Sequence, residues 1–138
     1  MFKCVICNKE SDGWKNNPEP LSDGVCCAKC NDEQVLPMRL FLAGLIKDQI
    51  LVLETGKTAF HFEKVKSGEE FLPQLQKAVE GYIELFPKSD TKFVFLVNEE
   101  GLIYGLEKNL LAKRIFDIDA VGNIVVCPKE YFVKCQIG

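Results

Sequence analysis

Two Cys-x-x-Cys pairs constrain the first third of this chain more than any other feature. Cys4 and Cys7 form the first pair, and Cys27 and Cys30 form the second, with 19 residues between the pairs. This separation is typical of a four-cysteine zinc site, because each pair can wrap a tight turn around one side of an ion. We therefore expect these four thiolates to hold one structural Zn²⁺ ion.

A closed four-thiolate site leaves no coordination position for water or substrate, so the pattern indicates a structural role and not hydrolysis. Two alternatives stay open. Cys26 stands beside Cys27 and competes for its place, although the regular two-residue gap favours Cys27. Iron is also held by four thiolates, so the pattern identifies the ligands better than the metal. A redox dithiol is less favoured, since it needs one pair beside a βαβ unit.

Residues 1–35 contain many turn-forming residues and few large apolar ones. Such a segment buries too little apolar surface to be stable alone, whereas structural zinc contributes about 10–16 kcal/mol of apparent folding free energy in small peptides. We expect 1–35 to be a zinc ribbon or knuckle module. The apolar stretch 35–46 carries Pro37, which suits a first helical turn, and it predicts a connecting helix over 36–47.

Charge and hydropathy exclude several classes of protein. The chain has 17 Lys and Arg residues against 20 Asp and Glu residues, a net charge of −3 that gives no overall attraction to phosphate backbones. Its apolar runs are too short to predict a membrane helix, and its first residues lack the apolar core of a signal peptide. We expect a cytoplasmic protein without a membrane partner, in which the cysteines are metal ligands and free thiols.

Residues 48–138 predict a compact α+β domain of about five strands and two helices. Apolar residues recur at helical spacing over 69–86, which Pro87 ends. Asn109 is placed to cap a second helix that runs to Ile115. The strands are expected at 50–54, 58–65, 92–97, 102–104 and 123–127, with a further edge strand at 131–135 and a hairpin turn at 55–57.

Several stretches of this domain carry a resemblance to a known family. They are 50–57 (ILVLETGK), 79–84 (VEGYIE), 98–101 (NEEG), Leu106 with Asn109 and Ala112, and 121–126 (VGNIVV). Over roughly residues 48–127 the chain resembles an uncharacterised domain family that occurs in short phage, plasmid and other mobile-element proteins. It departs from that family at Glu80, where paired glycines are usual, and at Thr55, where proline is usual.

The N-terminal piece is separately similar to small zinc proteins from phages and their hosts. The similarity lies in the two cysteine pairs and in 16–21 (NNPEPL), 24–31 (GVCCAKCN) and 36–39 (LPMR). Together the two resemblances imply a mobile-element origin and an α+β fold. They supply no catalytic residues.

We expect a non-catalytic binding protein that engages a host or phage macromolecule, most simply a host or phage protein, and a protein that blocks a bacterial defence system would be one form of it. The motif residues predict a binding surface made of Tyr82, Glu84, Asn98, Glu99, Glu100 and Asn109. The apolar stretch 35–46 is longer than a small zinc module can cover, so a homo-oligomer is a further expectation.

Three alternatives have less support in the sequence. Nucleic-acid binding through the zinc module would normally bring basic residues, and 1–46 holds five Lys and Arg against six Asp and Glu. An enzyme would have to use paired carboxylates among Glu84, Glu99 and Glu100, because the single histidine, His61, has no partner identifiable in sequence. A small-ligand-sequestering protein would use residues 82–84 and 98–101 as a pocket rim.

Overall fold

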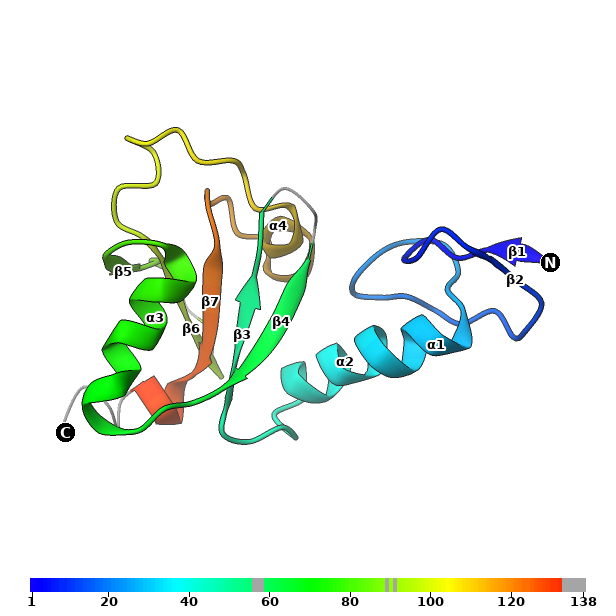
Figure 1. Ribbon diagram of the computed structural model, residues 1–138, viewed down its shortest axis with the longest axis horizontal. Helices are drawn as coiled ribbons and strands as arrows, with labels where there is room; N and C mark the ends of the chain where they lie inside the picture. Colours follow the sequence, from blue (N-terminus) through cyan, green and yellow to red (C-terminus); the bar gives the residue numbers. More distant parts are fainter. Residues whose placement is uncertain (56–58, 89, 91, 133–138) are drawn as a thin grey trace. The chain divides into compact units, whose positions relative to one another are not determined.

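The computed structural model describes residues 1–55, 59–88, 90 and 92–132 (Figure 1). The chain divides into two compact units, Met1–Lys47 and Asp48–Gly138. The fold class is α+β, as predicted, with a cysteine cluster in the first unit and a compact five-stranded domain in the second.

The first unit consists of a short hairpin, a long loop and a helical run. Strands β1 (Phe2–Lys3) and β2 (Glu10–Ser11) pair antiparallel and enclose the first cysteine pair. The helical run contains α1 (Ala28–Cys30), the π-helical turn η1 (Asn31–Val35) and α2 (Leu36–Leu42).

The predicted connecting helix over 36–47 agrees with the start of α2 at Leu36 but is too long, since α2 ends at Leu42. The helical path begins at Ala28, inside the second cysteine pair, so Pro37 lies within the run and not in its first turn. Within a helix, a proline lacks a backbone N–H donor and its ring crowds the preceding turn. The turn before Pro37 is a wider π turn, in which Leu36 N–H donates to Asn31 O, and this turn leaves room for the proline ring. At the other end Gly44 takes a φ of 78° and terminates the helix.

One hydrophobic cluster of the first unit is built largely from cysteines. Five of its eight members are cysteines: Cys4, Cys26 and Cys30 are buried with Val35, and Ile6, Cys7, Leu21 and Cys27 pack against them. Little apolar surface therefore surrounds the cysteine pairs, although Met38 and Phe41 of α2 are also buried.

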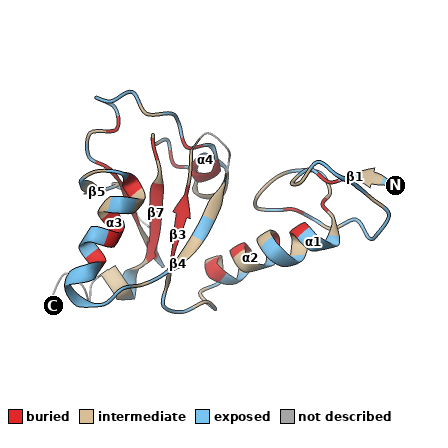
Figure 2. Ribbon diagram, viewed as in Figure 1, coloured by how far each residue is buried: buried red, intermediate tan, exposed pale blue. Residues whose placement is uncertain are grey.

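The second unit is built on an antiparallel sheet of strand order β4-β3-β7-β6-β5. The strands are β3 (Gln49–Leu53), β4 (Phe60–Lys64), β5 (Ile83–Leu85), β6 (Phe93–Asn98) and β7 (Ile124–Pro128). Figure 2 shows buried residues along β3 and β7. Their nearly continuous apolar sequences, ILVL and IVVC, agree with burial on both faces of the sheet.

Two helices pack against this sheet. On one face, Phe71, Leu75 and Val79 of α3 (Phe71–Val79) form a core with sheet residues such as Ile50 and Leu96. Phe93 and Phe95 of β6 contact Phe116 of α4 (Leu110–Phe116), with ring centroids 6.3 and 5.0 Å apart. A 3₁₀ turn, η2 (Gly68–Glu70), leads into α3.

The predicted helix over 69–86 is too long. It ends at Val79, because Glu80 adopts a left-handed conformation with φ 61° and residues 83–85 form β5 against β6. The Asn98 side chain stabilises this end by donating to Val79 O at 3.0 Å and to Glu80 O at 3.3 Å. Of the predicted apolar stripe, Tyr82, Ile83 and Phe86 lie outside the helix.

Two predicted strands are also wrong. Residues 102–104 form turns, closed by Tyr104 N–H to Glu100 O at 3.0 Å and Leu106 N–H to Gly101 O at 3.0 Å. Residues 129–132 are helical, so the predicted edge strand at 131–135 does not form over its described part. The remaining strands and the Asn109-capped helix are confirmed with bounds within two residues, and most of the predicted hairpin turn, at 56–57, lies outside the described residues.

Candidate metal centre and groove

The first cysteine pair lies on a tight turn between β1 and β2. Asn8 N–H donates to Cys4 O at 2.9 Å, and Cys4 N–H donates to Lys9 O at 3.0 Å. Asn8 takes a φ of 62°, a conformation that asparagine tolerates better than most residues. Inside the turn, Ile6 N–H points at the Cys4 sulfur, 3.4 Å away.

The second pair lies at the start of the helical run. Cys27 occupies the N-cap position, with extended backbone angles, and Cys30 closes the first turn, where Asn31 N–H donates to Cys27 O at 2.9 Å. One helical turn thus places two thiols on the same side. The loop before it packs on the first turn at Gly24, where a Cβ would meet Val5 Cγ1 at 2.8 Å.

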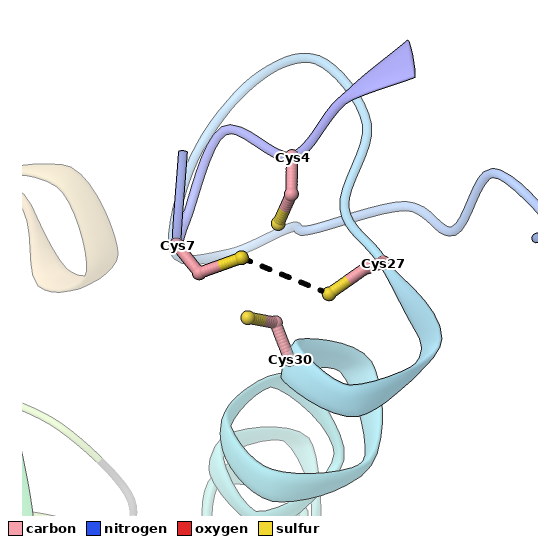
Figure 3. A group of neighbouring side chains, drawn as sticks. All are labelled: Cys4, Cys7, Cys27 and Cys30. Carbon is pink, nitrogen blue, oxygen red and sulfur yellow. Dashed lines mark hydrogen bonds between the residues drawn. The ribbon is translucent and has the colours of Figure 1, made fainter. Parts of the chain in front are cut away.

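Figure 3 shows the four sulfur atoms pointing toward one another from these two turns. All four lie within 4.8 Å of each other, and the Cys7 and Cys27 sulfurs are 3.9 Å apart. Four thiolates around Zn²⁺ at about 2.3 Å, arranged as a regular tetrahedron, place their sulfurs about 3.8 Å apart. The Cys7–Cys27 distance agrees with this value, and the cluster could hold a tetrahedral metal ion.

The thiols of the cluster differ in acidity. Burial raises the pKa of Cys4, but backbone N–H groups of Cys7, Cys27 and Ile6 outweigh it and bring that pKa down to about 6. Burial, followed by the contacts with Cys27, Cys7 and Cys4, raises the pKa of Cys30. Cys4 is thus the more acidic and Cys30 the less acidic of these two thiols, so a divalent cation that binds both would displace a proton from Cys30.

Cys26 lies outside this cluster although it is fully buried. Its backbone pairs with Asn16 on the other side of the loop, with N–H and C=O contacts of 2.8 and 3.0 Å. Burial, and then the neighbouring Cys4 and Cys27, raise its pKa. The structure thus brings together the four predicted ligands and separates Cys26 from them.

The second unit contains a groove of about 370 Å³, which we call the β5 groove. It is lined by residues 84–87, 97–99, 102–103 and 119–121. Two of its wall residues, Leu102 and Ile103, are 84% and 81% exposed. The groove thus combines apolar walls with the carboxylates of Glu84, Glu99 and Asp119.

The six residues of the predicted binding surface do not all lie at this groove. Glu84, Asn98 and Glu99 line it. Tyr82 is exposed and lies two residues before Glu84 in sequence, and Glu100 is half-buried on the turn after β6.

The two asparagines of that surface serve the fold. Both are buried, and the Asn98 amide ties the end of α3 to β6. Asn109 donates to Leu53 O and Gly122 O at 2.9 Å each, and its side-chain oxygen accepts from Ala112 N–H at 3.0 Å. Their hydrogen bonds are made inside the domain and not toward solvent.

His61 has partners that the sequence analysis missed. Its Nδ1 lies 2.7 Å from Glu54 Oε1, and its Nε2 lies 2.6 Å from Glu63 Oε2. Burial lowers the pKa of His61, but the hydrogen bonds to Glu63 and Glu54 outweigh it and raise the pKa above its usual value. The alternation of side chains along strands could have predicted these partners. Glu63 is two residues along β4 from His61, and Glu54 is two residues beyond Val52, the cross-strand neighbour of His61, so the three side chains share one face of the sheet.

The family model described as Domain of unknown function (DUF3846) matches residues 46–133. The chain belongs to this family. The DUF3846 match covers the five-stranded domain and its groove, fits the uncharacterised family predicted from the motifs, and leaves the cysteine cluster outside its span.

Searches among curated proteins and among solved structures gave no match to the chain. Among the described residues, no helix is long and apolar enough to cross a membrane.

Proposed function

We propose that this chain is a non-catalytic protein that binds another macromolecule, with its first unit stabilised by Zn²⁺ and its second unit providing the contact surface. The observation that carries the binding role is the β5 groove, whose wall residues Leu102 and Ile103 are 84% and 81% exposed and are followed in sequence by Tyr104, which is 66% exposed. Single exposed apolar residues are normal, whereas a contiguous group beside a groove is typical of an interaction site.

The proposed zinc site rests on the donor set and its spacing. Cys4, Cys7, Cys27 and Cys30 supply four soft ligands within 4.8 Å of one another, and structural zinc sites use such a four-cysteine set. The ion would stabilise a cysteine-rich cluster that has few other apolar members. It would have all four positions occupied by protein, so the chemistry it supplies is structural.

The surroundings of His61 support a non-catalytic role. A histidine acts as a general base through an unprotonated ring nitrogen. Carboxylates contact both ring nitrogens here, which favours the doubly protonated imidazolium. His61 is therefore suited to joining β3 and β4 and not to accepting a proton from a substrate.

Nucleic-acid binding by the first unit has less support. The cleft beside the cysteine cluster is lined by two lysines, Lys9 and Lys29, and by two glutamates, Glu10 and Glu33. Such a balance gives a phosphate backbone no net attraction.

A small-ligand-sequestering role is the second candidate function. The β5 groove has a volume within the range of small-molecule sites, which is about 300–1,000 Å³. Its three carboxylates would then favour a cationic ligand.

The proposed setting is the cytoplasm of a bacterial host. The resemblance to phage and mobile-element families supports a phage or mobile-element origin, and it motivates a host or phage protein as the partner. Interference with a bacterial defence system is one form that such binding would take.

Reconstitution with purified components tests this proposal. Proteins captured by the full chain from bacterial lysate are expressed singly, and direct binding is measured by calorimetry. We expect saturable binding to a discrete protein, and weak DNA or RNA affinity that collapses between low and physiological salt. Tight, salt-resistant binding to one nucleic-acid sequence would refute the proposal.

A further inference from the structure

The β5 groove has an uneven charge. Glu84, Glu99 and Asp119 line it, and its described lining includes no Lys, Arg or His. Asp119 has a neighbouring cation, since Lys113 Nζ lies 3.3 Å from its Oδ2. Glu84 and Glu99 remain as carboxylates without a cation in the groove lining. Positive charge on an occupant of this groove would therefore interact favourably with these carboxylates.

The walls of the groove are apolar and favour an occupant that also carries apolar side chains. Leu102 and Ile103 present most of their side-chain surface to solvent, and Leu85 is 53% exposed. Covering this surface would remove apolar area from water, which is the main favourable term in association.

The strand that borders the groove favours an extended occupant. Among the described strands, β5 lies at one end of the sheet and pairs only with β6. Tyr82 O accepts from Glu99 N–H and Phe86 N–H donates to Phe95 O, both at 2.8 Å. In an antiparallel ladder of this register, the backbone groups of Ile83 and Leu85 point away from β6 and can pair with an added strand.

Two other occupants fit the charge less well. A two-fold symmetric contact between copies of this chain would bring the carboxylates of both grooves together. A nucleic acid would bring phosphates to Glu84 and Glu99. Both arrangements oppose like charges at the centre of the contact.

We infer that the β5 groove is the docking site for an extended segment of a partner protein that carries large apolar side chains together with lysine or arginine. The inference rests on the proposed binding function and adds the surface and the chemistry of the partner. The apolar side chains cover Leu102 and Ile103, and the basic side chains lie beside Glu84 and Glu99.

A displayed library of random linear peptides, selected on the full chain, tests the inference. We expect selected peptides to be enriched in lysine, arginine and large apolar residues and depleted in acidic residues. Affinity of a labelled selected peptide should fall about tenfold or more in Ile103→Asp, because a charge replaces an apolar anchor. Leu72→Asp is the matched control, since Leu72 is a 50% exposed leucine on α3, outside the groove lining, and it should keep wild-type affinity.

Charge reversal gives a readout that a folding defect cannot imitate. Glu84→Lys with Glu99→Lys should weaken binding of the selected peptide by about two- to fivefold for each carboxylate. The same double variant should bind better than wild type to a peptide in which glutamate replaces each lysine. Glu69→Lys, at an exposed position in η2, is the control for net charge and should change neither affinity.

Each of the following outcomes would overturn the inference. Selected peptides that are acidic, or none at all, would exclude the proposed partner chemistry. A dimer that Ile103→Asp dissociates would assign the groove to a second copy, and nucleic-acid binding lost in that variant would assign it to nucleic acid. A purified partner protein that binds wild type and Ile103→Asp equally would refute the groove and still support the proposed binding function.

Discussion

The sharpest prediction concerns the neighbours Cys26 and Cys27. Replacing Cys27 with serine removes one of four thiolates whose sulfurs lie within 4.8 Å of each other. A structural zinc site contributes about 10–16 kcal/mol in small peptides, which matches or exceeds the total stability of a typical domain, about 5–15 kcal/mol. Since the cluster around the cysteines has few apolar members besides them, Cys27→Ser should lose the metal and unfold the part of the unit that carries the cysteine pairs.

Replacing Cys26 with serine should have a smaller effect. The change puts a hydroxyl in a fully buried position, which costs about 1–3 kcal/mol when the group finds no partner. The cluster and the backbone contacts to Asn16 stay in place. We therefore expect Cys26→Ser to retain the metal with a less stable first unit.

Metal content of the purified variants, measured by elemental mass spectrometry, decides between the two residues. Wild type and Cys26→Ser should each contain about one zinc ion per chain, and Cys27→Ser should contain little. Full occupancy in Cys27→Ser together with loss in Cys26→Ser would show that the ligand set is wrong. Iron in place of zinc would agree with the ligand set and refute the assignment of the metal as zinc.

The remaining predictions concern protons, close packing and a buried amide. The protein should retain less metal as the pH is lowered, because protons compete with the metal for the thiolates. Dialysis at about pH 5 should therefore remove more zinc than dialysis at about pH 8. An NMR titration of His61, the single histidine, should give a pKa above 6.5. The stability that its ion pairs contribute is fully present below that value and is lost as pH rises through the raised pKa. A free energy of unfolding that depends on pH equally in wild type and in His61→Gln would contradict this role. Gly81→Ala should lower the free energy of unfolding by about 1–3 kcal/mol, since its Cβ would lie 2.7 Å from Asn98 Nδ2, whereas Gly13→Ala should be neutral. Asn109→Ala should cost roughly 2–4 kcal/mol in denaturant unfolding through a lost cap and two unpaired acceptors, and Asn109→Ser should recover the cap, about 1 kcal/mol.

The sequence predicted most of the local structure because the strongest patterns were local. Cysteine spacing identified the four clustered thiols, and the apolar runs at 50–53 and 124–127 identified the paired interior strands β3 and β7. The Asn109 cap followed from the residue type alone.

The errors arose where distant residues decide the local conformation. The stripe over 69–86 continues at helical spacing past Val79, but the amide of Asn98, far along the chain, holds the helix end, and pairing with β6 takes residues 83–85. Residues 102–104 have strand-forming side chains but make turn hydrogen bonds instead. The motifs singled out Asn98 and Asn109, but the sequence did not predict that both side chains are buried, because distant parts of the chain cover them.

The continuity of the helical run with the second cysteine pair has a consequence for folding. Forming a first helical turn is the unfavourable step in helix formation, and isolated helices shorter than about 12–15 residues are marginal in water. Cys27 and Cys30 flank the first turn of this run, so an ion that fixes both sulfurs would also fix the backbone angles of that turn. The metal would then act as a helix nucleus. Amide exchange should accordingly accelerate on metal removal as far as Leu42, well beyond the last ligand.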